Sequence, residues 1–135
     1  MAKLVSINAA GRLVALRKSA VKNVRAYNKE QIDAHALEWF DSPTNDTSAN
    51  MWVCVNVPEF TCLCPITGQP DFARIELFYQ PVARCGESKS LKLYCGSFRN
   101  VGTFHEAVAV RICNDLSLLL KPKWLLVIAR FAPRG

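Results

Sequence analysis

The chain has 135 residues and a mass of 15.1 kDa, which is enough for one modest domain and too little for two. Its composition, 50% hydrophobic and 21% charged, is that of a globular protein and excludes a disordered one. The net charge of +6 suits an anionic partner, either nucleic acid or a phosphorylated cofactor. The longest apolar stretch, residues 116–129, contains Lys121-Pro122-Lys123 and is too short to span a bilayer, so no membrane association is expected.

Residues 1–36 are expected to form a basic N-terminal segment that precedes a single domain over residues 37–135. Up to Lys29 the segment carries lysine and arginine without any acidic residue. Leucine and valine lie among these charges, which favours a loosely amphipathic helix. An organelle-targeting peptide has the same composition and stays an alternative. A tRNA-binding arm is less favoured, because no aromatic residue precedes Tyr27.

Two β-strands joined by a tight turn are predicted after a polar loop at residues 41–50. Residues 51–57 are rich in valine and tryptophan, which is typical of a strand. Residues 65–70 contain two prolines and a glycine and predict the turn. Residues 74–79 alternate polar and apolar side chains, as in a half-buried strand.

Two helices and a last strand follow. In residues 88–98, Leu91, Cys95 and Phe98 recur at helical spacing and share one face. Residues 103–120 show the same period, and Thr103 with Glu106 fits a capping box at the start of this helix. The apolar positions of the second helix are Val108, Ile112, Leu116 and Leu119.

Residues 124–131 are typical of a buried strand. The order strand, strand, helix, helix, strand predicts an α+β fold with an antiparallel sheet.

Cys64 and Asp71 flank the predicted turn. A sharp turn can bring a thiol and a carboxylate seven residues apart into one small cavity. A cysteine at a loop edge is also more accessible than one inside a strand, as reactivity requires. A structural role is common for such a pair, so this pattern alone leaves catalysis open.

The octet 87–94, Glu-Ser-Lys-Ser-Leu-Lys-Leu-Tyr, opens the first predicted helix. Lys89 and Lys92 are three residues apart and therefore share a face. Together with unpaired amides at the helix N-terminus, they could bind phosphate groups. The competing interpretation is a solvated basic face with Ser88 as the helix cap.

His105 and Glu106 begin the second predicted helix. A carboxylate here can accept hydrogen bonds from a purine-like ring, and histidine titrates near neutrality. The capping box is the competing explanation for Glu106, and an ordinary core or surface role is the one for His105. No metal site is expected, because Cys62, Cys64 and His105 lack the spacing of a zinc finger.

Three segments, residues 58–71, 87–94 and 97–106, together resemble the 7-cyano-7-deazaguanine reductases, the nitrile reductases of queuosine biosynthesis, in their short single-module form. The first segment contains Thr-Cys-Leu-Cys-Pro and Thr-Gly-Gln-Pro-Asp, and the last ends in His-Glu. The octet marks the NADPH-using branch of the family. The resemblance implies an α+β tunnelling fold (T-fold), in which an antiparallel sheet carries two helices on one face. It also implies a cytoplasmic homo-oligomeric ring with active sites between subunits.

The resemblance also assigns roles to individual residues. Cys64 would attack the nitrile carbon and form a thioimide, while Asp71 would donate a proton with the assistance of His105. The substrate is a free deazaguanine base, so tRNA binding is not expected. The residues implied to bind this base are Gly86, Glu87, Ser88, His105 and Glu106. Those implied to hold NADPH are Ser88, Lys89, Lys92, Arg134 and Gly135.

The sequence departs from the family at two places within the domain. Cys62 stands where the family usually has serine, which puts a second thiol near the nucleophile. The sequence also stops at Arg134-Gly135, where a fourth strand is expected to begin, so the final strand is expected to be missing.

Two alternatives remain open. A related T-fold amidinotransferase acting on deazaguanine in tRNA should lack the octet. A non-catalytic purine-binding subunit would be compatible with a missing strand.

Overall fold

The computed structural model describes residues 32–133 of the chain. The predicted N-terminal helix within residues 1–29, and Arg134 and Gly135, lie outside these described residues. The described elements are a 3-10 turn η2 (Ala34–Ala36), β1 (Trp39–Asp41), β2 (Val53–Leu63), β3 (Pro70–Gln80), β4 (Arg84–Gly86), α2 (Ser88–Gly96), α3 (His105–Leu120) and β5 (Trp124–Phe131).

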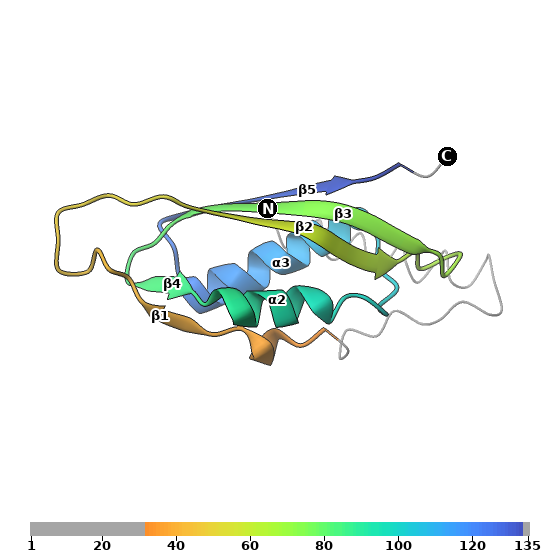
Figure 1. Cartoon of the computed structure of the whole chain (residues 1–135), viewed down its shortest axis with the longest axis horizontal. Coiled ribbons are helices and arrows are strands. Elements are labelled where there is room, and N and C mark those ends of the chain that lie inside the picture. Colours follow the sequence, from red (N-terminus) through yellow and green to blue (C-terminus); the bar gives the residue numbers. More distant parts are fainter. Residues whose placement is uncertain (1–31, 134–135) are drawn as a thin grey trace.

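A three-stranded antiparallel sheet forms one layer of the fold, with the strand order β2-β3-β5 within residues 32–133. Both α2 and α3 lie against the same face of this sheet (Figure 1). The short strands β1 and β4 pair with each other beside the helices. The predicted α+β architecture with two helices on one face is therefore confirmed.

Strand β2 extends six residues beyond the predicted end at residue 57. Its pairing with β3 shifts register between Val57 and Phe60, across Pro58 and Glu59. Proline cannot donate a ladder hydrogen bond, and an irregularity in the pairing lets the strand continue past it. The strand then runs on to Leu63, which places Cys64 at the start of the turn.

The hydrophobic core lies between the sheet and the helices. Strand β3 contributes the alternate residues Ile75, Leu77 and Tyr79, as the period of a half-buried strand predicts. The predicted buried face of α2 is confirmed, with Leu91, Cys95 and Phe98 all in the core. Burial raises the pKa of the Cys95 thiol to about 12, so this thiol is expected to be inert.

The buried face of α3 differs from the prediction at its last position. Leu119 is only partly buried, and Leu120 lies in the core instead. The buried positions are thus Val108, Ile112, Leu116 and Leu120, each four residues from the next. Residues four apart lie one above the other on a helix, so Leu120 continues the row.

The predicted capping box at the start of α3 is wrong. Phe104 is the N-cap residue and makes no side-chain cap hydrogen bond. Thr103 is buried, and its backbone N–H donates to the carbonyl oxygen of Leu63 at 3.0 Å. Because this bond holds Thr103 in an extended segment beside β2, its hydroxyl does not cap the helix.

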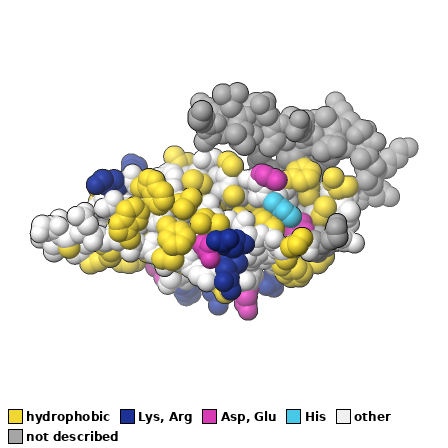
Figure 2. Space-filling view, turned by 90° about the horizontal axis from the view of Figure 1, so that it is seen from above, with side chains coloured by type: hydrophobic (Ala, Val, Ile, Leu, Met, Phe, Trp, Pro, Cys, Tyr) yellow, Lys and Arg dark blue, Asp and Glu magenta, His cyan; other side chains and the backbone are white. Residues whose placement is uncertain are grey.

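Hydrophobic side chains gather on the sheet face opposite the helices (Figure 2). Trp52, at 61% exposure, and Trp124 meet edge to face with ring centroids 5.5 Å apart. Leu126, on β5, is also exposed. Within residues 32–133, none of the helices has the length and apolarity needed to cross a bilayer.

Tyr94 ties α2 to α3 through a partly buried hydrogen bond. Its hydroxyl donates to Asp115 Oδ2 at 2.7 Å, and the same oxygen accepts from Arg111 Nε at 2.6 Å. Burial, followed by the hydrogen bond and charge of Asp115, raises the pKa of Tyr94 above its ordinary value. The phenol is therefore neutral and a permanent donor.

Tyr94→Phe should lower the free energy of unfolding by about 2 kcal/mol, because the lost hydrogen bond has a charged acceptor. Urea denaturation measures the change. Tyr79→Phe is the matched control: it removes a neutral hydrogen bond from Gly86 N–H at 3.0 Å and should cost only about 1 kcal/mol. Equal losses of unfolding free energy in the two variants would contradict the stronger hydrogen bond expected from the charged Asp115 acceptor.

Candidate active site

Cys64 lies at the start of the turn that joins β2 to β3. Its N–H donates to the Gln69 carbonyl oxygen at 2.7 Å, and its own carbonyl accepts from Gly68 N–H at 2.9 Å. Gly68 has a φ of +69°, in the left-handed region that favours glycine. These backbone hydrogen bonds close the turn between the two strands. The turn places Cys64 at the loop edge, as predicted.

The Cys64 thiol has a pKa below its ordinary value. Partial burial acts against this by raising the pKa, as does the nearby negative charge of Asp71. Hydrogen bonds from the Thr67 side chain and from the N–H groups of Thr67 and Ile66 outweigh both effects. The Thr67 N–H lies 3.5 Å from Cys64 Sγ. Because the thiolate is the nucleophilic form of cysteine, this turn favours reactivity.

Asp71 and His105 meet beside this turn. Asp71 is the second residue of β3 and is only 6% exposed. His105 begins α3, and its Nε2 atom lies 3.4 Å from Asp71 Oδ2. The imidazole also stacks on the Phe131 ring at the end of β5, with ring centroids 3.8 Å apart. Three elements thus place a carboxylate and an imidazole together.

One open cleft of about 330 Å³ brings together four of the predicted site residues: Cys64, Asp71, His105 and Glu106. This volume is at the lower end of the range for small-molecule sites. The exposed carboxylate of Glu106 stands at the cleft. The sequence interpretation missed the other lining residues, Pro65, Thr103, Phe104, Ala132 and Pro133.

The start of α2 differs from the prediction. Glu87, not Ser88, caps the helix, and its carboxylate accepts from Lys89 N–H at 2.9 Å and Ser90 N–H at 2.6 Å. These two hydrogen bonds, the Lys89 amide first, lower the pKa of Glu87. These two amides are therefore not unpaired, and the prediction that they are free to bind phosphate is wrong. Lys89 and Lys92 remain as exposed cations on the same helix.

Gly86, Glu87 and Ser88 do not join the cleft. Gly86 packs against the last residue of α3, where an added Cβ would lie 3.7 Å from Leu120 Cδ1. His105 is the first residue of the same helix, about 22 Å away at 1.5 Å per residue. Figure 1 shows β4 and the end of β5 toward opposite ends of the molecule. One chain therefore holds the two predicted groups of substrate-binding residues far apart.

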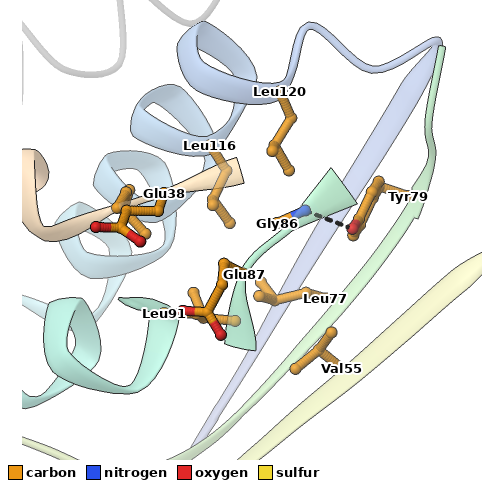
Figure 3. Close-up of a pocket in the computed structure, with 10 residues that line it drawn as sticks. Glu38, Val55, Leu77, Tyr79, Gly86, Glu87, Leu91, Leu116 and Leu120 are labelled. Carbon is orange, nitrogen blue, oxygen red and sulfur yellow. Dashed lines mark hydrogen bonds between the residues drawn. The ribbon is translucent and has the colours of Figure 1, made fainter. Parts of the chain in front are cut away.

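A small apolar cavity lies behind Gly86 and Glu87 (Figure 3). Leu77, Leu116 and Leu120 line it, and its volume is about 20 Å³. Such a cavity holds about one water molecule and cannot contain a bicyclic base. Any ligand of residues 86–88 must therefore lie outside this cavity, on the surface.

The second thiol of the Thr-Cys-Leu-Cys segment lies away from the cleft. Cys62 is fully buried in the core, with 0% exposure, whereas Cys64 is partly exposed. Neither of these two cysteines is part of a disulfide. Within residues 32–133, no group of three or more potential metal-ligating side chains comes together.

The chain is similar to a known family model and to proteins with curated names. A family model described as QueF-like protein matches residues 70–135. A protein of Anaeromyxobacter sp. (strain K) is 61% identical over 83 residues, which cover 62% of this chain and 68% of the relative. One from Anaeromyxobacter sp. (strain Fw109-5) is 52% identical over 102 residues, covering 76% and 82%, respectively. Both are named NADPH-dependent 7-cyano-7-deazaguanine reductase.

A solved structure shares the fold. The crystal structure of the archaeosine synthase QueF-Like in the apo form aligns with a TM-score of 0.55 at 17% sequence identity. The alignment covers 63% of this chain and 94% of that one. At this identity the likeness shows the fold alone, and it confirms the predicted tunnelling fold.

Thr67→Val should raise the pKa of Cys64, because the thiolate loses the hydrogen bond from the Thr67 side chain. At neutral pH less thiolate is then present, and alkylation of Cys64 by iodoacetamide should slow. Peptide mass mapping across a pH series measures the rate at Cys64 alone, and Thr67→Ser, which keeps a hydroxyl, is the control. An unchanged pH profile in Thr67→Val would contradict this account of the thiol.

Proposed function

The chain belongs to the family of NADPH-dependent 7-cyano-7-deazaguanine reductases, and we propose that it reduces the nitrile of 7-cyano-7-deazaguanine to an aminomethyl group in queuosine biosynthesis. One observation carries the proposal beyond family membership. A thiol of lowered pKa, Cys64, shares a cleft with a buried carboxylate and an imidazole. A nitrile needs this set, namely a nucleophile for its carbon and a proton source for its nitrogen.

In the proposed first step the Cys64 thiolate adds to the nitrile carbon. A C–S bond forms, one C–N π bond breaks, and the nitrogen takes a proton to give a thioimide. Asp71 would donate this proton, and His105, 3.4 Å from its carboxylate, would assist. Covalent capture holds the substrate carbon in place while the remaining bonds are reduced.

The base would be held by Glu106 and His105 at the start of α3. The Glu106 carboxylate is exposed at the cleft and makes no hydrogen bond to a described side chain, so it is available to accept from the N–H groups of a deazaguanine. A bicyclic base is flat and apolar on its faces, which suits the Phe104 and Pro133 lining.

NADPH supplies hydride when it is bound, and two equivalents are needed to convert a nitrile into a primary amine. Lys89 and Lys92 lie exposed on α2 and fit the phosphate groups of this cofactor as side-chain cations. Ser88, Arg134 and Gly135 stay predicted contacts. Glu87 occupies the first helix amides, so phosphate binding on α2 would depend on the lysines rather than on the helix backbone.

We further propose that each active site combines two copies of the chain in a homo-oligomeric ring. Residues 86–88 and the Cys64 cleft are predicted to bind the same substrate, yet α3 separates them by about 22 Å in one chain. A neighbouring copy can supply residues 86–88 to the cleft of the first. The exposed tryptophans of the outer sheet face are also typical of a surface that is covered on assembly.

The remaining sequence predictions are kept as proposals. These are a boundary between residues 36 and 37, and a cytoplasmic location, where thiols remain reduced. The substrate is proposed to be the free base, so tRNA is not a proposed partner.

Cys64→Ala should abolish NADPH oxidation with 7-cyano-7-deazaguanine, and with it the thioimide adduct in the intact-protein mass spectrum. Cys54→Ala, which changes an exposed thiol on the opposite sheet face, is the matched control and should keep full turnover. A fully active Cys64→Ala variant would overturn the covalent step. Turnover that requires tRNA and an amine donor instead of NADPH would favour an amidinotransferase.

Mixing two inactive variants tests the shared site. Cys64→Ala lacks the proposed nucleophile, and the double variant Lys89→Glu, Lys92→Glu lacks the proposed cofactor lysines on α2. In mixed rings formed by co-expression, about a quarter of the sites should be intact, because each contribution is native in half of the copies. No recovery of activity in mixed rings, with both variants correctly assembled, would contradict a site shared between chains.

A further inference from the structure

The His105 imidazole lies flat against the ring of Phe131. The two ring centroids are 3.8 Å apart, and the ring planes differ by only 5°. The two residues are 26 positions apart in sequence, one at the start of α3 and the other at the end of β5. No sequence motif places them together, so the contact is a product of the fold.

Among residues 32–133, the only other recorded contact of the His105 side chain is with Asp71. The His105 side chain is 42% exposed, and the Nε2 atom lies 3.4 Å from Asp71 Oδ2, which is longer than a good hydrogen bond. The terminal torsion of a histidine side chain also has a broad energy minimum. Without a further contact, the imidazole would therefore sample several orientations at the mouth of the cleft.

Phe131, in contrast, is firmly held. It pairs with Ala73 in the β3–β5 ladder, and the next residue, Ala132, donates its N–H to the Phe72 carbonyl oxygen at 2.9 Å. Its ring meets Phe60 edge to face, with centroids 6.2 Å apart. Phe60 is 2% exposed and belongs to the core. The sheet and the core together thus fix the ring on which the imidazole rests.

We propose that Phe131 is a positioning residue for His105, which holds the imidazole parallel to its own ring with Nε2 directed at Asp71. The flat face restricts rotation of the imidazole, and the Asp71 carboxylate sets which edge faces inward. The catalytic consequence rests on the proposed function, because proton delivery near Asp71 depends on this geometry. The positioning itself is a property of the fold.

The stack can be observed directly by NMR of the histidine ring protons. The chain has only two histidines, so the His105 signals can be assigned with His105→Asn and compared with those of His35, which is exposed. In the full chain, the face of Phe131 should shift the His105 ring protons upfield. Phe131→Leu should remove this shift, whereas Phe131→Tyr, which keeps a flat ring, should preserve it.

A matched control makes the same change elsewhere in the sheet. Phe78→Leu alters a partly buried phenylalanine on the outer face of β3, and the His105 signals should not move. An upfield shift that survives in Phe131→Leu, or that is absent from the unmodified chain, would overturn the proposal. If Phe131→Leu fails to fold, Phe131→Met provides the same test with another flexible side chain.

Kinetics then separate positioning from general packing. Phe131→Leu should lower kcat about tenfold, with the KM for the nitrile base within about twofold, and Phe131→Tyr should restore kcat. In a His105→Ala background, Phe131→Leu should cause no further loss, because the group through which it acts is gone. An additive loss in the double variant would overturn the proposal. An inactive unmodified chain would count against the proposed reaction, while the NMR shift would still decide the positioning.

Discussion

The backbone pairing of Leu63 with the segment just before α3 is the contact on which the site depends. Leu63 donates to the Val101 carbonyl at 3.0 Å and accepts from Thr103 N–H at 3.0 Å, forming a parallel bridge with Gly102. Cys64 follows Leu63 by one residue, and His105 follows Thr103 by two. The bridge therefore joins the turn that carries Cys64, the proposed nucleophile, to the helix that carries the imidazole and Glu106. These bonds use only backbone groups, so they engage no side chain of the cleft.

The length of α3 is a second constraint, because it separates the Cys64 cleft from residues 86–88. The helix has the proposed site residues His105 and Glu106 in its first turn, and its last residue lies beside Gly86. A rigid helix of 16 residues cannot bring these ends together. The cavity at the Gly86 end holds no more than a water molecule. This geometry supports the proposal that a neighbouring copy of the chain completes the site.

Sequence patterns predicted the elements more reliably than the contacts at their ends. The helical period located the buried faces of both helices, because core burial sets that period. The predictions of caps failed at Thr103 and Ser88 for a common physical reason. A helix cap depends on which of several nearby polar groups accepts hydrogen bonds from the free amides at the helix start. At Thr103 the long-range backbone pairing with Leu63 holds the residue away from this role. Glu87, one residue before Ser88, reaches the amides with a longer side chain.

In the candidate site, too, the local features could be predicted and the long-range contacts could not. The turn composition placed Cys64 and Asp71 together, since the separation along the sequence is short and the glycine and prolines restrict the path. The stacking of His105 on Phe131 could not be predicted, because it depends on how far β5 runs along β3 before it ends. Contacts between elements that are distant in sequence are fixed by sheet register, which no local pattern records.

The octet combines two physical tasks that its sequence alone does not distinguish. Glu87 caps the first amides of α2, and Tyr94 ties the helix to α3 through its hydrogen bond to Asp115. Lys89 and Lys92, between them, point their charges to solvent. A carboxylate at the cap would repel a phosphate placed directly on the helix axis. If the proposed cofactor site on α2 is used, Glu87 would therefore direct the phosphate to the side of the helix that Lys89 and Lys92 share.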